Sequence, residues 1–265
     1  TKKLKRMKVV IFAGGFGTRI SEESYLKPKP MIEIGGKPIL WHIIKTYESQ
    51  GFDDFIICLG YKGYLIKEYF MNYHIHNADL EIDLSKNSTK ILQSDSEKIN
   101  ITLIETGLNT KTAGRLKQVQ KHIGNERFML TYGDGLSNID YNELLKFHEK
   151  HGKIATVSSI MPEGKFGSII TDQNNNVVQF MEKPKGDGHW INGGFFVLEP
   201  EVFNFLNGDM DDVMWEDSPL HDLTNENELV AYKHDGFWKC MDAIRDKVEL
   251  EKLWEKDCPP WKIWN

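Results

Sequence analysis

Cysteine is scarce in this chain, and no two cysteines have the short spacing of a disulfide framework or a zinc site. The three thiols, Cys58, Cys240 and Cys258, are far apart in the sequence. An odd number of cysteines without a short-spaced pair is typical of free thiols in a reducing compartment. We therefore expect the protein to work in the cytoplasm.

Long hydrophobic runs are also absent. No apolar stretch approaches the roughly 20 residues that a membrane-spanning helix needs. The basic residues 2–6 and the apolar run Val9–Phe12 imitate the start of a signal peptide, but that run is short and glycines follow it. We interpret the segment as a basic leader before a buried strand, and we leave the residues before Met7 out of the functional interpretation.

The chain has no excess of positive charge. Its 33 lysines and arginines oppose 39 acidic residues, which gives a formal net charge of −6. This balance excludes a broad basic surface for nucleic acid or an anionic membrane. It is silent about a local phosphate pocket, because net charge says little about one cleft. The 265 residues, 40 % of them hydrophobic, are enough for one large globular unit.

Short apolar runs alternate with segments of helical period, which is typical of α/β proteins with helices layered on a sheet. Residues 77–100 are polar and lack a strong period, so we expect a hairpin or loop there. No repeat or low-complexity linker divides the chain, and we expect a single domain. The predicted strands are 8–12, 55–59, 101–105, 128–132, 155–160, 177–181, 191–198 and 229–232, and the predicted helices lie at 38–51, around 66–70, at 116–123 and at 242–256.

A glycine-rich segment follows the first predicted strand. It reads Phe12-Ala13-Gly14-Gly15-Phe16-Gly17-Thr18-Arg19. Glycines let backbone N–H groups approach an anion without obstruction by Cβ, and Arg19 adds a cation, so the segment favours a phosphate cradle. It lacks the ending of a Walker A loop, and Ile20 stands where GxGxxG needs its third glycine. A tight turn that serves packing alone is the alternative.

Two lysines alternate with prolines a little further on, in Lys27-Pro28-Lys29-Pro30. The prolines hold the lysines in an extended arrangement of low entropy. In isolation this segment is equally typical of a solvated basic loop. Together with the glycine segment, Arg19 and Lys29 supply what a triphosphate needs, namely main-chain donors and two cations that offset charge on a leaving pyrophosphate.

These motifs resemble the sugar-1-phosphate nucleotidyltransferase family. The resemblance rests on residues 13–19, on Lys29-Pro30 and on Gly36-Lys37-Pro38-Ile39, and it extends from Met7 to the tail at 261–264. Further segments resemble the branch of the family that activates glucose 1-phosphate with CTP. Those segments are 60–63, 131–135, 182–188, 191–196 and 241–246.

The resemblance implies a Rossmann-like fold, in which a mixed, mostly parallel sheet is flanked by helices. It implies a nucleotide-binding half at about residues 7–136 and a sugar-phosphate-binding half with the C-terminal helix and tail at about 137–265. It also implies CTP and glucose 1-phosphate as substrates, Mg²⁺ as cofactor and a homo-oligomeric assembly. The aromatic tail with Trp254, Trp261 and Trp264 fits either a subunit interface or an intramolecular clasp.

In the resembled family the nucleotide lies between the glycine segment and a second loop, which is 106–116 in this chain. Ala113 stands where the branch commonly has glycine, which opposes close backbone approach at that point. The choice of cytosine over uracil follows from the resemblance and not from hydrogen-bond logic. The implied nucleotide-binding residues are Phe12, Ala13, Gly14, Gly15, Phe16, Gly17, Thr18, Arg19, Lys29, Thr110, Arg115 and Gly133.

An aspartate follows the strongest buried strand, in Gly133-Asp134-Gly135. Groups at the carboxyl ends of strands are where α/β proteins bind ligands, and Mg²⁺ takes a few carboxylates together with phosphate oxygens and water. The resemblance implies Asp242 as the second carboxylate. On the residues alone, Asp134 is equally typical of a turn and Asp242 of a helix N-cap.

The second half supplies the acceptor side of the site. The strand at 177–181 is followed by Glu182 and Lys183, which suit a sugar hydroxyl and a phosphate, respectively. In the resembled family these positions contact the hexose and its phosphate, and Asn192 with Gly193 approaches the sugar. A solvated Glu–Lys pair on the surface is the alternative for Glu182 and Lys183.

The implied reaction needs no protein nucleophile, because the phosphate of the sugar attacks the nucleotide directly. The catalytic residues are then Arg19, Lys29, Asp134 and Lys183, which align two anions and offset charge. A nucleotidyltransferase that uses UTP, dTTP or another acceptor is the first alternative. A regulatory homologue that binds nucleotide without turnover is the second, and the failed GxGxxG discourages an NAD-dependent dehydrogenase.

Overall fold

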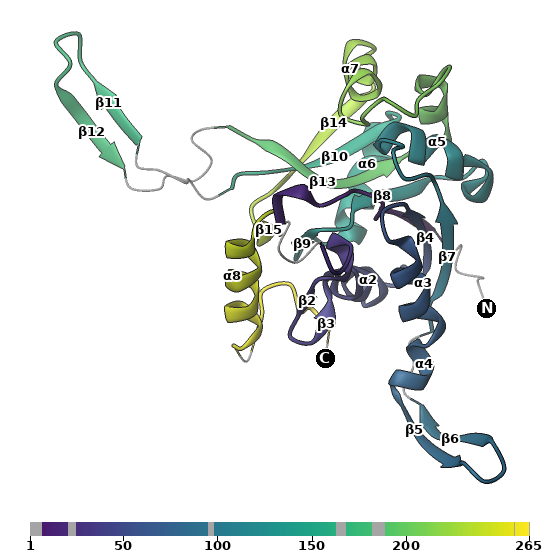
Figure 1. Cartoon of the computed structure of the whole chain (residues 1–265). Helices are drawn as coiled ribbons and strands as arrows, with labels where there is room; N and C mark the ends of the chain where they lie inside the picture. Colours follow the sequence, from purple (N-terminus) through teal and green to yellow (C-terminus); the bar gives the residue numbers. More distant parts are fainter. Residues whose placement is uncertain are drawn as a thin grey trace.

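The fold is built on one seven-stranded sheet (Figure 1). The computed structural model describes residues 7–20, 25–94, 98–162, 168–181, 189–256 and 258–264. The strand order is β14-β10-β13-β8-β1-β4-β7. The strands are β1 (Lys8–Phe12), β4 (Asp54–Leu59), β7 (Asn100–Glu105), β8 (Phe128–Tyr132), β10 (Ala155–Ile160), β13 (Ile191–Leu198) and β14 (Leu229–His234).

Strand direction confirms the mixed, mostly parallel sheet. The pairs β1–β4, β1–β8, β4–β7 and β10–β14 are parallel, whereas β13 runs antiparallel to both β8 and β10. The four strands from the first half of the chain are neighbours, and the three from the second half continue the sheet beyond β8. One sheet therefore joins the two halves at the β8–β13 pair.

Both faces of the sheet are covered by helices, which explains the continuous apolar runs of its inner strands. In β1, Val9 and Ile11 enter one core cluster, and Val10 and Phe12 enter the other. The first cluster takes in α2 (Ile39–Glu48), α3 (Gly63–Met71), α6 (Tyr141–His151) and α8 (Ile244–Trp254). The second takes in α5 (Thr112–Ile123), α7 (Ser218–Asn225) and the 3₁₀ segment η4 (Pro200–Phe205).

Two hairpins extend away from the sheet and its helices (Figure 1). The pair β5 (Ala78–Asp83) and β6 (Ser88–Ser94) follows the short helix α4 (Tyr73–His76) and confirms the hairpin predicted in this region. The pair β11 (Ser168–Thr171) and β12 (Val177–Met181) forms the second. Residues 177–181 are therefore a strand, as predicted, but they lie outside the central sheet.

Several short elements follow the central strands. The 3₁₀ turns are η1 (Thr18–Ile20) and η2 (Lys29–Met31), and the small strand pairs are β2 (Glu33–Ile34) with β3 (Lys37–Pro38) and β9 (Gly135–Ser137) with β15 (Trp238–Cys240). In the described part of the chain, no helix has the length and apolar character needed to cross a membrane.

The aromatic tail packs as an intramolecular clasp. Trp261 is fully buried, and its indole N–H donates to Nδ1 of His42 on α2 over 3.3 Å. The rings of Trp254 and Phe237 stack on it at centroid distances of 6.1 and 5.5 Å. Trp264 meets Trp41 edge to face. These contacts favour the clasp over a subunit interface as the place of the tail tryptophans.

Candidate active site

The site lies where β1 and β8 end side by side. The two strands are parallel neighbours with Phe12 opposite Tyr132, so the residues that follow them emerge at one edge of the sheet. Gly133 donates its N–H to the carbonyl of Phe12 over 2.9 Å. A Cβ on Gly133 would lie 2.7 Å from the same carbonyl oxygen, so this approach needs glycine. The glycine segment and Asp134 are thereby brought together.

Lys29 connects two carboxylates that are distant in the sequence. Its ammonium donates to Oδ2 of Asp134 over 2.6 Å and to Oδ1 of Asp242 over 2.7 Å. Lys29 begins η2, and the pairing of β9 with β15 carries the chain back from Asp134 to Asp242. The N–H of Met241 donates to the carbonyl of Asp134 over 2.9 Å, which fixes the two segments to each other.

The charge of Lys29 is stabilised by these partners. Burial by itself would lower the pKa of this amine, but the charges and hydrogen bonds of Asp134 and Asp242 outweigh burial and raise the pKa above its usual value. The lysine therefore stays charged across the physiological range. It holds one positive charge between two negative ones, at the point where the resemblance places both the triphosphate and the metal.

The donor set fits a divalent cation. Oxygens of Asp134 and Asp242 and the sulfur of Cys240 lie within 4.8 Å of one another. Two carboxylates with room for water and phosphate oxygens are the ligands that Mg²⁺ prefers, whereas a thiol is a soft ligand that suits other metals. Asp242 is not the helix N-cap that its position allowed, because the carboxylate of Asp246 accepts the N–H groups of Asp242 and Ala243 at 3.0 and 2.8 Å.

The glycine segment forms an open loop that packs on the buried side chain of Arg115. A Cβ on Gly15 would meet nothing within 4 Å, whereas one on Gly14 would lie 2.2 Å from the guanidinium of Arg115. Gly17 has a φ of 63°, which favours glycine. The side chains of Phe16 and Thr18 are exposed. The backbone of Arg19 lies in η1, and its side chain is outside the part of the chain that the structure describes.

Arg115 supports this loop by a hydrogen bond to its backbone. Only 3 % of it is exposed, and it donates to the carbonyls of Leu59 and Gly14 at 2.9 and 3.0 Å and to the hydroxyl of Thr106 at 2.7 Å. Burial lowers the pKa of its guanidinium. Its predicted contact with the nucleotide stays a prediction, because the bonds that the structure shows are all to the protein itself.

The loop at 106–116 is tightly built. A Cβ on Gly107 would lie 2.5 Å from the hydroxyl of Thr110, and one on Gly114 would meet Thr110 and Asp211 at under 3 Å. Ala113 is fully buried in the core cluster that contains α5. Its methyl group therefore packs on the protein, and the departure from glycine at this position does not obstruct the exposed side of the loop.

The sugar-phosphate side is described in part. Glu182 and Lys183 lie outside the described residues. Asn192 is exposed at the start of β13 and accepts the N–H of Gly194 over 2.8 Å. The carbonyl of Gly193 accepts the indole N–H of Trp238 over 2.8 Å, and a Cβ on Gly193 would lie 2.8 Å from the hydroxyl of Ser158.

Sequence reasoning missed one carboxylate at this edge of the sheet. Glu216 accepts a hydrogen bond from the hydroxyl of Tyr132, the residue two before Asp134. Burial and the charge of Glu216 raise the pKa of Tyr132 far above its usual value, so the phenol remains a donor. The Trp215-Glu216-Asp217 segment carries no glycine or proline, and nothing local indicates where it lies.

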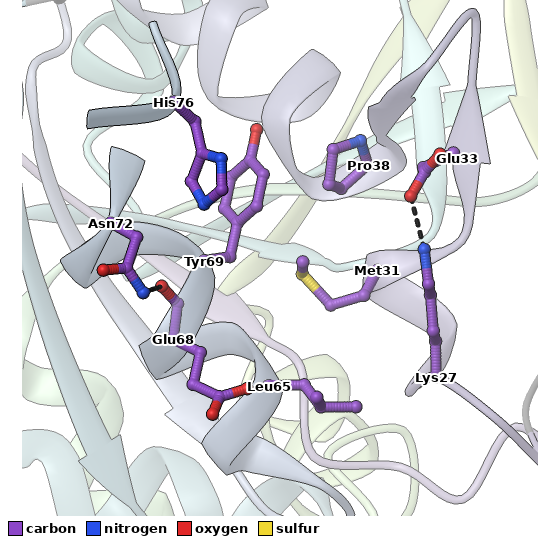
Figure 2. A pocket seen from close by; sticks show the side chains of 9 residues that line it. All are labelled: Lys27, Met31, Glu33, Pro38, Leu65, Glu68, Tyr69, Asn72 and His76. Carbon is purple, nitrogen blue, oxygen red and sulfur yellow. Dashed lines mark hydrogen bonds and ion pairs between the residues drawn. The ribbon is translucent and has the colours of Figure 1, made fainter. Parts of the chain in front are cut away.

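A cavity of about 430 Å³ lies beside the site and does not contain it (Figure 2). It is formed between the segment from Lys27 to Pro38 and helices α3 and α4, and Lys27 pairs with Glu33 at its side. None of Lys29, Asp134 and Asp242 lines it. The residues that do are Lys27, Met31, Glu33, Pro38, Leu65, Glu68, Tyr69, Asn72 and His76.

The fold and the clustered charges define a nucleotide-transferring enzyme, and comparison with known proteins agrees. The chain belongs to the nucleotidyl transferase family, whose model matches residues 8–243. Its relatives point to a particular member. It is 51 % identical to the glucose-1-phosphate cytidylyltransferase of Salmonella typhi, over 98 % of this chain and 100 % of that one. It is 45 % identical to a Bacillus subtilis protein described as "probable glucose-1-phosphate cytidylyltransferase", over 97 % and 100 % of the two chains.

A solved structure confirms the architecture. The structure of a UDP-glucose pyrophosphorylase complexed with UDP-glucose superposes with a TM-score of 0.67. The match covers 95 % of this chain and 99 % of that one, at 17 % sequence identity. At this identity the likeness shows the shared fold alone.

Proposed function

We propose that this protein transfers the cytidylyl group of CTP to glucose 1-phosphate, which gives CDP-glucose and pyrophosphate. The observation that carries the proposal is the 51 % identity, over nearly the whole chain, to a glucose-1-phosphate cytidylyltransferase. The convergence of Lys29, Asp134 and Asp242 at the carboxyl edge of the sheet supports it.

The reaction proceeds by direct attack. A phosphate oxygen of glucose 1-phosphate forms a bond to the α-phosphorus of CTP, and the bond from that phosphorus to the bridging oxygen of pyrophosphate breaks. The second pKa of a phosphate monoester is about 6, so the attacking group is largely dianionic near pH 7 and needs no general base. Catalysis then consists of alignment and electrostatic stabilisation.

The protein's own groups divide this work. The glycine segment from Phe12 to Thr18 cradles the phosphates, with Arg19 and Lys29 as the cations that face the triphosphate. Thr110, Gly133 and Arg115 form the surroundings of the nucleotide. Glu182, Lys183, Asn192 and Gly193 receive the sugar phosphate.

Asp134 and Asp242 would hold Mg²⁺. The bound ion would offset the negative charge of the triphosphate and help to orient it. The two carboxylates already converge on a cation, since the ammonium of Lys29 lies within 2.7 Å of both. Lys29 offsets the negative charge of the two carboxylates while no metal is bound.

The halves at about 7–136 and 137–265 form one domain with two adjoining sites. The continuous seven-stranded sheet supports this organisation. We further propose a cytoplasmic enzyme that assembles as a homo-oligomer. Three free cysteines support the reducing compartment. Exposed apolar side chains on the hairpin β5–β6 support the assembly.

The experiment is a nucleotide panel with glucose 1-phosphate as acceptor. CTP, UTP and dTTP are compared at equal concentrations with Mg²⁺, and pyrophosphate release is followed together with the sugar nucleotide formed. We expect CTP to be the preferred donor. Negligible turnover with CTP but not with UTP or dTTP would indicate the wrong base, and binding of CTP without turnover of any nucleotide would indicate a regulatory homologue.

A further inference from the structure

Residues 211–217 form neither a helix nor a strand, and they lie along the start of helix α5. The N–H groups of Lys111 and Ala113 donate to the carbonyls of Asp211 and Val213 at 2.7 and 3.1 Å. The N–H of Trp215 then donates to the hydroxyl of Thr112 over 2.7 Å. Because Trp215 is fully buried, the residue that follows it is delivered to a fixed place.

That residue is Glu216, and its two carboxylate oxygens bind two different parts of the site. Oε1 accepts the hydroxyl of Tyr132 at the end of β8. Oε2 accepts the hydroxyl of Thr112 at the start of α5 over 3.3 Å. One half-buried carboxylate therefore connects the helix that carries Arg115 with the strand that leads to Asp134.

Tyr132 in turn contacts the sugar-phosphate side. Gly194 has a φ of 82°, and a Cβ there would lie 2.5 Å from the ring of Tyr132, so the ring packs directly on the backbone of β13. Asn192 hydrogen-bonds the same hydroxyl that Glu216 accepts. The ring of Tyr132 consequently supports the backbone of residues 192–194 by direct packing.

We propose that Glu216 is a positioning residue for the sugar phosphate, because it fixes Tyr132 against Asn192 and Gly194. The inference rests on the proposed function, since it concerns the acceptor side of that site. Glu216 itself need not touch either substrate. Without its carboxylate, Tyr132 loses its charged acceptor, and the wall formed by residues 192–194 loses its support.

The test compares Tyr132→Phe, Glu216→Ala and Glu216→Gln by steady-state kinetics in which each substrate is varied in turn. Because residues 192–194 lose their support in both variants, we expect Tyr132→Phe and Glu216→Ala to raise the KM for glucose 1-phosphate by about 10-fold or more. The KM for CTP should change by less than about 2-fold on the same reasoning. Glu216→Gln keeps an acceptor for the phenol and should restore most of the affinity.

The double variant tests whether the two residues act as a unit. Tyr132→Phe with Glu216→Ala should be no worse than the more severe single variant, because both remove one interaction. Asp217→Asn, a change at the exposed neighbouring carboxylate, is the matched control and should behave as wild type. Thermal unfolding of each variant shows whether the fold is kept.

Three results would overturn the inference: equal changes in the KM of both substrates, no recovery in Glu216→Gln, or additive losses in the double variant. Isothermal titration of glucose 1-phosphate without nucleotide gives the same comparison independently of turnover. Wild-type protein that does not use CTP would contradict the proposed function instead, and the titration series would still decide the role of Glu216.

Discussion

Lys29 is the side chain on which the two acidic residues of the candidate site converge. With its ammonium within 2.7 Å of both Asp134 and Asp242, it competes for the carboxylates that would hold a metal. Lys29→Met removes the charge and keeps the length. We expect turnover to fall by about 100-fold or more, as for other lost electrostatic contacts to a transition state. We expect Mg²⁺ to bind the nucleotide-free protein more tightly, as measured by isothermal titration, because the ammonium no longer competes with the ion for the two carboxylates.

Asp134→Asn provides the contrast to Lys29→Met. It also removes turnover, but it should weaken Mg²⁺ binding, and circular dichroism should show an unchanged fold because a metal ligand is not a core contact. Near-normal activity of this variant in saturating Mg²⁺ would count against Asp134 as a ligand. Weaker Mg²⁺ binding in Lys29→Met would show that the lysine supports the metal site and does not compete with it.

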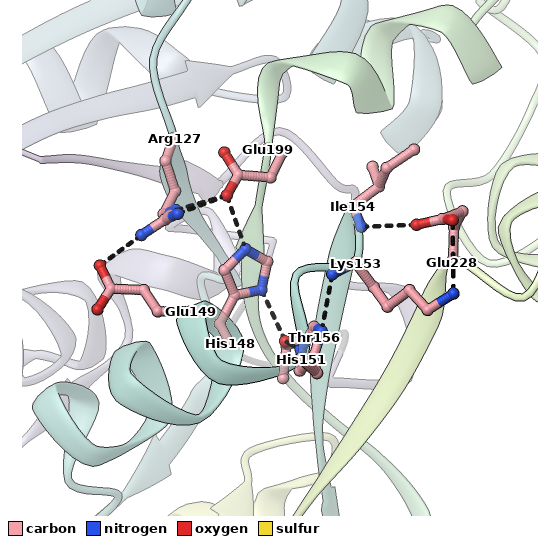
Figure 3. Close-up of polar contacts among 9 residues, drawn as sticks. All are labelled: Arg127, His148, Glu149, His151, Lys153, Ile154, Thr156, Glu199 and Glu228. Atoms are coloured by element: carbon pink, nitrogen blue, oxygen red, sulfur yellow. Dashed lines mark hydrogen bonds and ion pairs between the residues drawn. The ribbon is translucent and has the colours of Figure 1, made fainter.

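His148 is a buried titratable group in a separate cluster of polar side chains (Figure 3). Its Nδ1 lies 2.7 Å from the hydroxyl of Thr156 and its Nε2 lies 3.2 Å from Glu199, which also pairs with Arg127. Burial, then the nearby charges of Arg127 and His151, lower its pKa to about 4, although Glu199 acts in the opposite direction. The imidazole is therefore neutral in the folded protein at pH 7.

This pKa shift predicts a loss of stability in acid. Between about pH 6.5 and 4 the unfolded chain binds one more proton at His148 than the folded chain, so the free energy of unfolding decreases as the pH falls, by up to about 1.4 kcal/mol per pH unit. We expect His148→Gln to remove that part of the slope in urea unfolding at a series of pH values. An unchanged slope in His148→Gln would contradict the assignment.

At the scale of elements, periodicity located most strands and helices but not their arrangement. Continuous apolar runs such as Val9–Phe12 predict burial on both faces, and the structure confirms it. No local pattern indicates that β13 runs antiparallel to its neighbours or that β12 lies outside the central sheet, because residues distant in the sequence determine which strands pair. Helix α6 was missed, since Tyr141, Leu144 and His148 are its only buried residues.

The candidate site shows the same limit. Lys29, Asp134 and Asp242 were grouped by resemblance, and no spacing in the sequence predicts that one ammonium contacts both carboxylates. Arg115 lies beside Leu116 on the buried face of α5, and no local pattern indicates that its guanidinium also supports the glycine segment through the carbonyl of Gly14. Glu216 was not identified, because its role depends on contact with the hydroxyl of Tyr132, which is distant in the sequence.

The turn between β2 and β3 depends on how the tail packs. Gly35 and Gly36 both have positive φ, of 59° and 73°, but a Cβ on Gly35 would lie 1.8 Å from the indole nitrogen of Trp254, whereas one on Gly36 would meet nothing within 4 Å. Gly36→Ala should cost about 1–2 kcal/mol of left-handed strain. Gly35→Ala should cost about 1–3 kcal/mol more, because it also displaces Trp254. Urea unfolding of both variants measures the difference in the free energy of unfolding. Equal losses of stability would show that Trp254 moves aside without a measurable cost.

At the scale of the whole molecule, the net charge of −6 and an anionic pair of substrates are compatible because the cations of the site are few and local. Lys29 is held by two carboxylates, and Arg19 follows the glycine segment at the same edge of the sheet. The net charge of the whole chain does not set the potential inside one cleft. The charge balance thus limits where anions bind and does not exclude them.

The projecting hairpin β5–β6 exposes apolar side chains, and we expect the proposed homo-oligomer to form there. Ile82, Leu84, Ile91 and Leu92 are 47–88 % exposed. An isolated two-stranded hairpin is marginally stable in water, and exposed apolar groups of this kind mark interaction sites. We expect Leu84→Glu with Leu92→Glu to lower the mass measured by light scattering toward the 30.7 kDa of one chain. Ile170→Glu with Val178→Glu on the other hairpin is the matched control, and an unchanged mass in the first variant would place the subunit contact elsewhere.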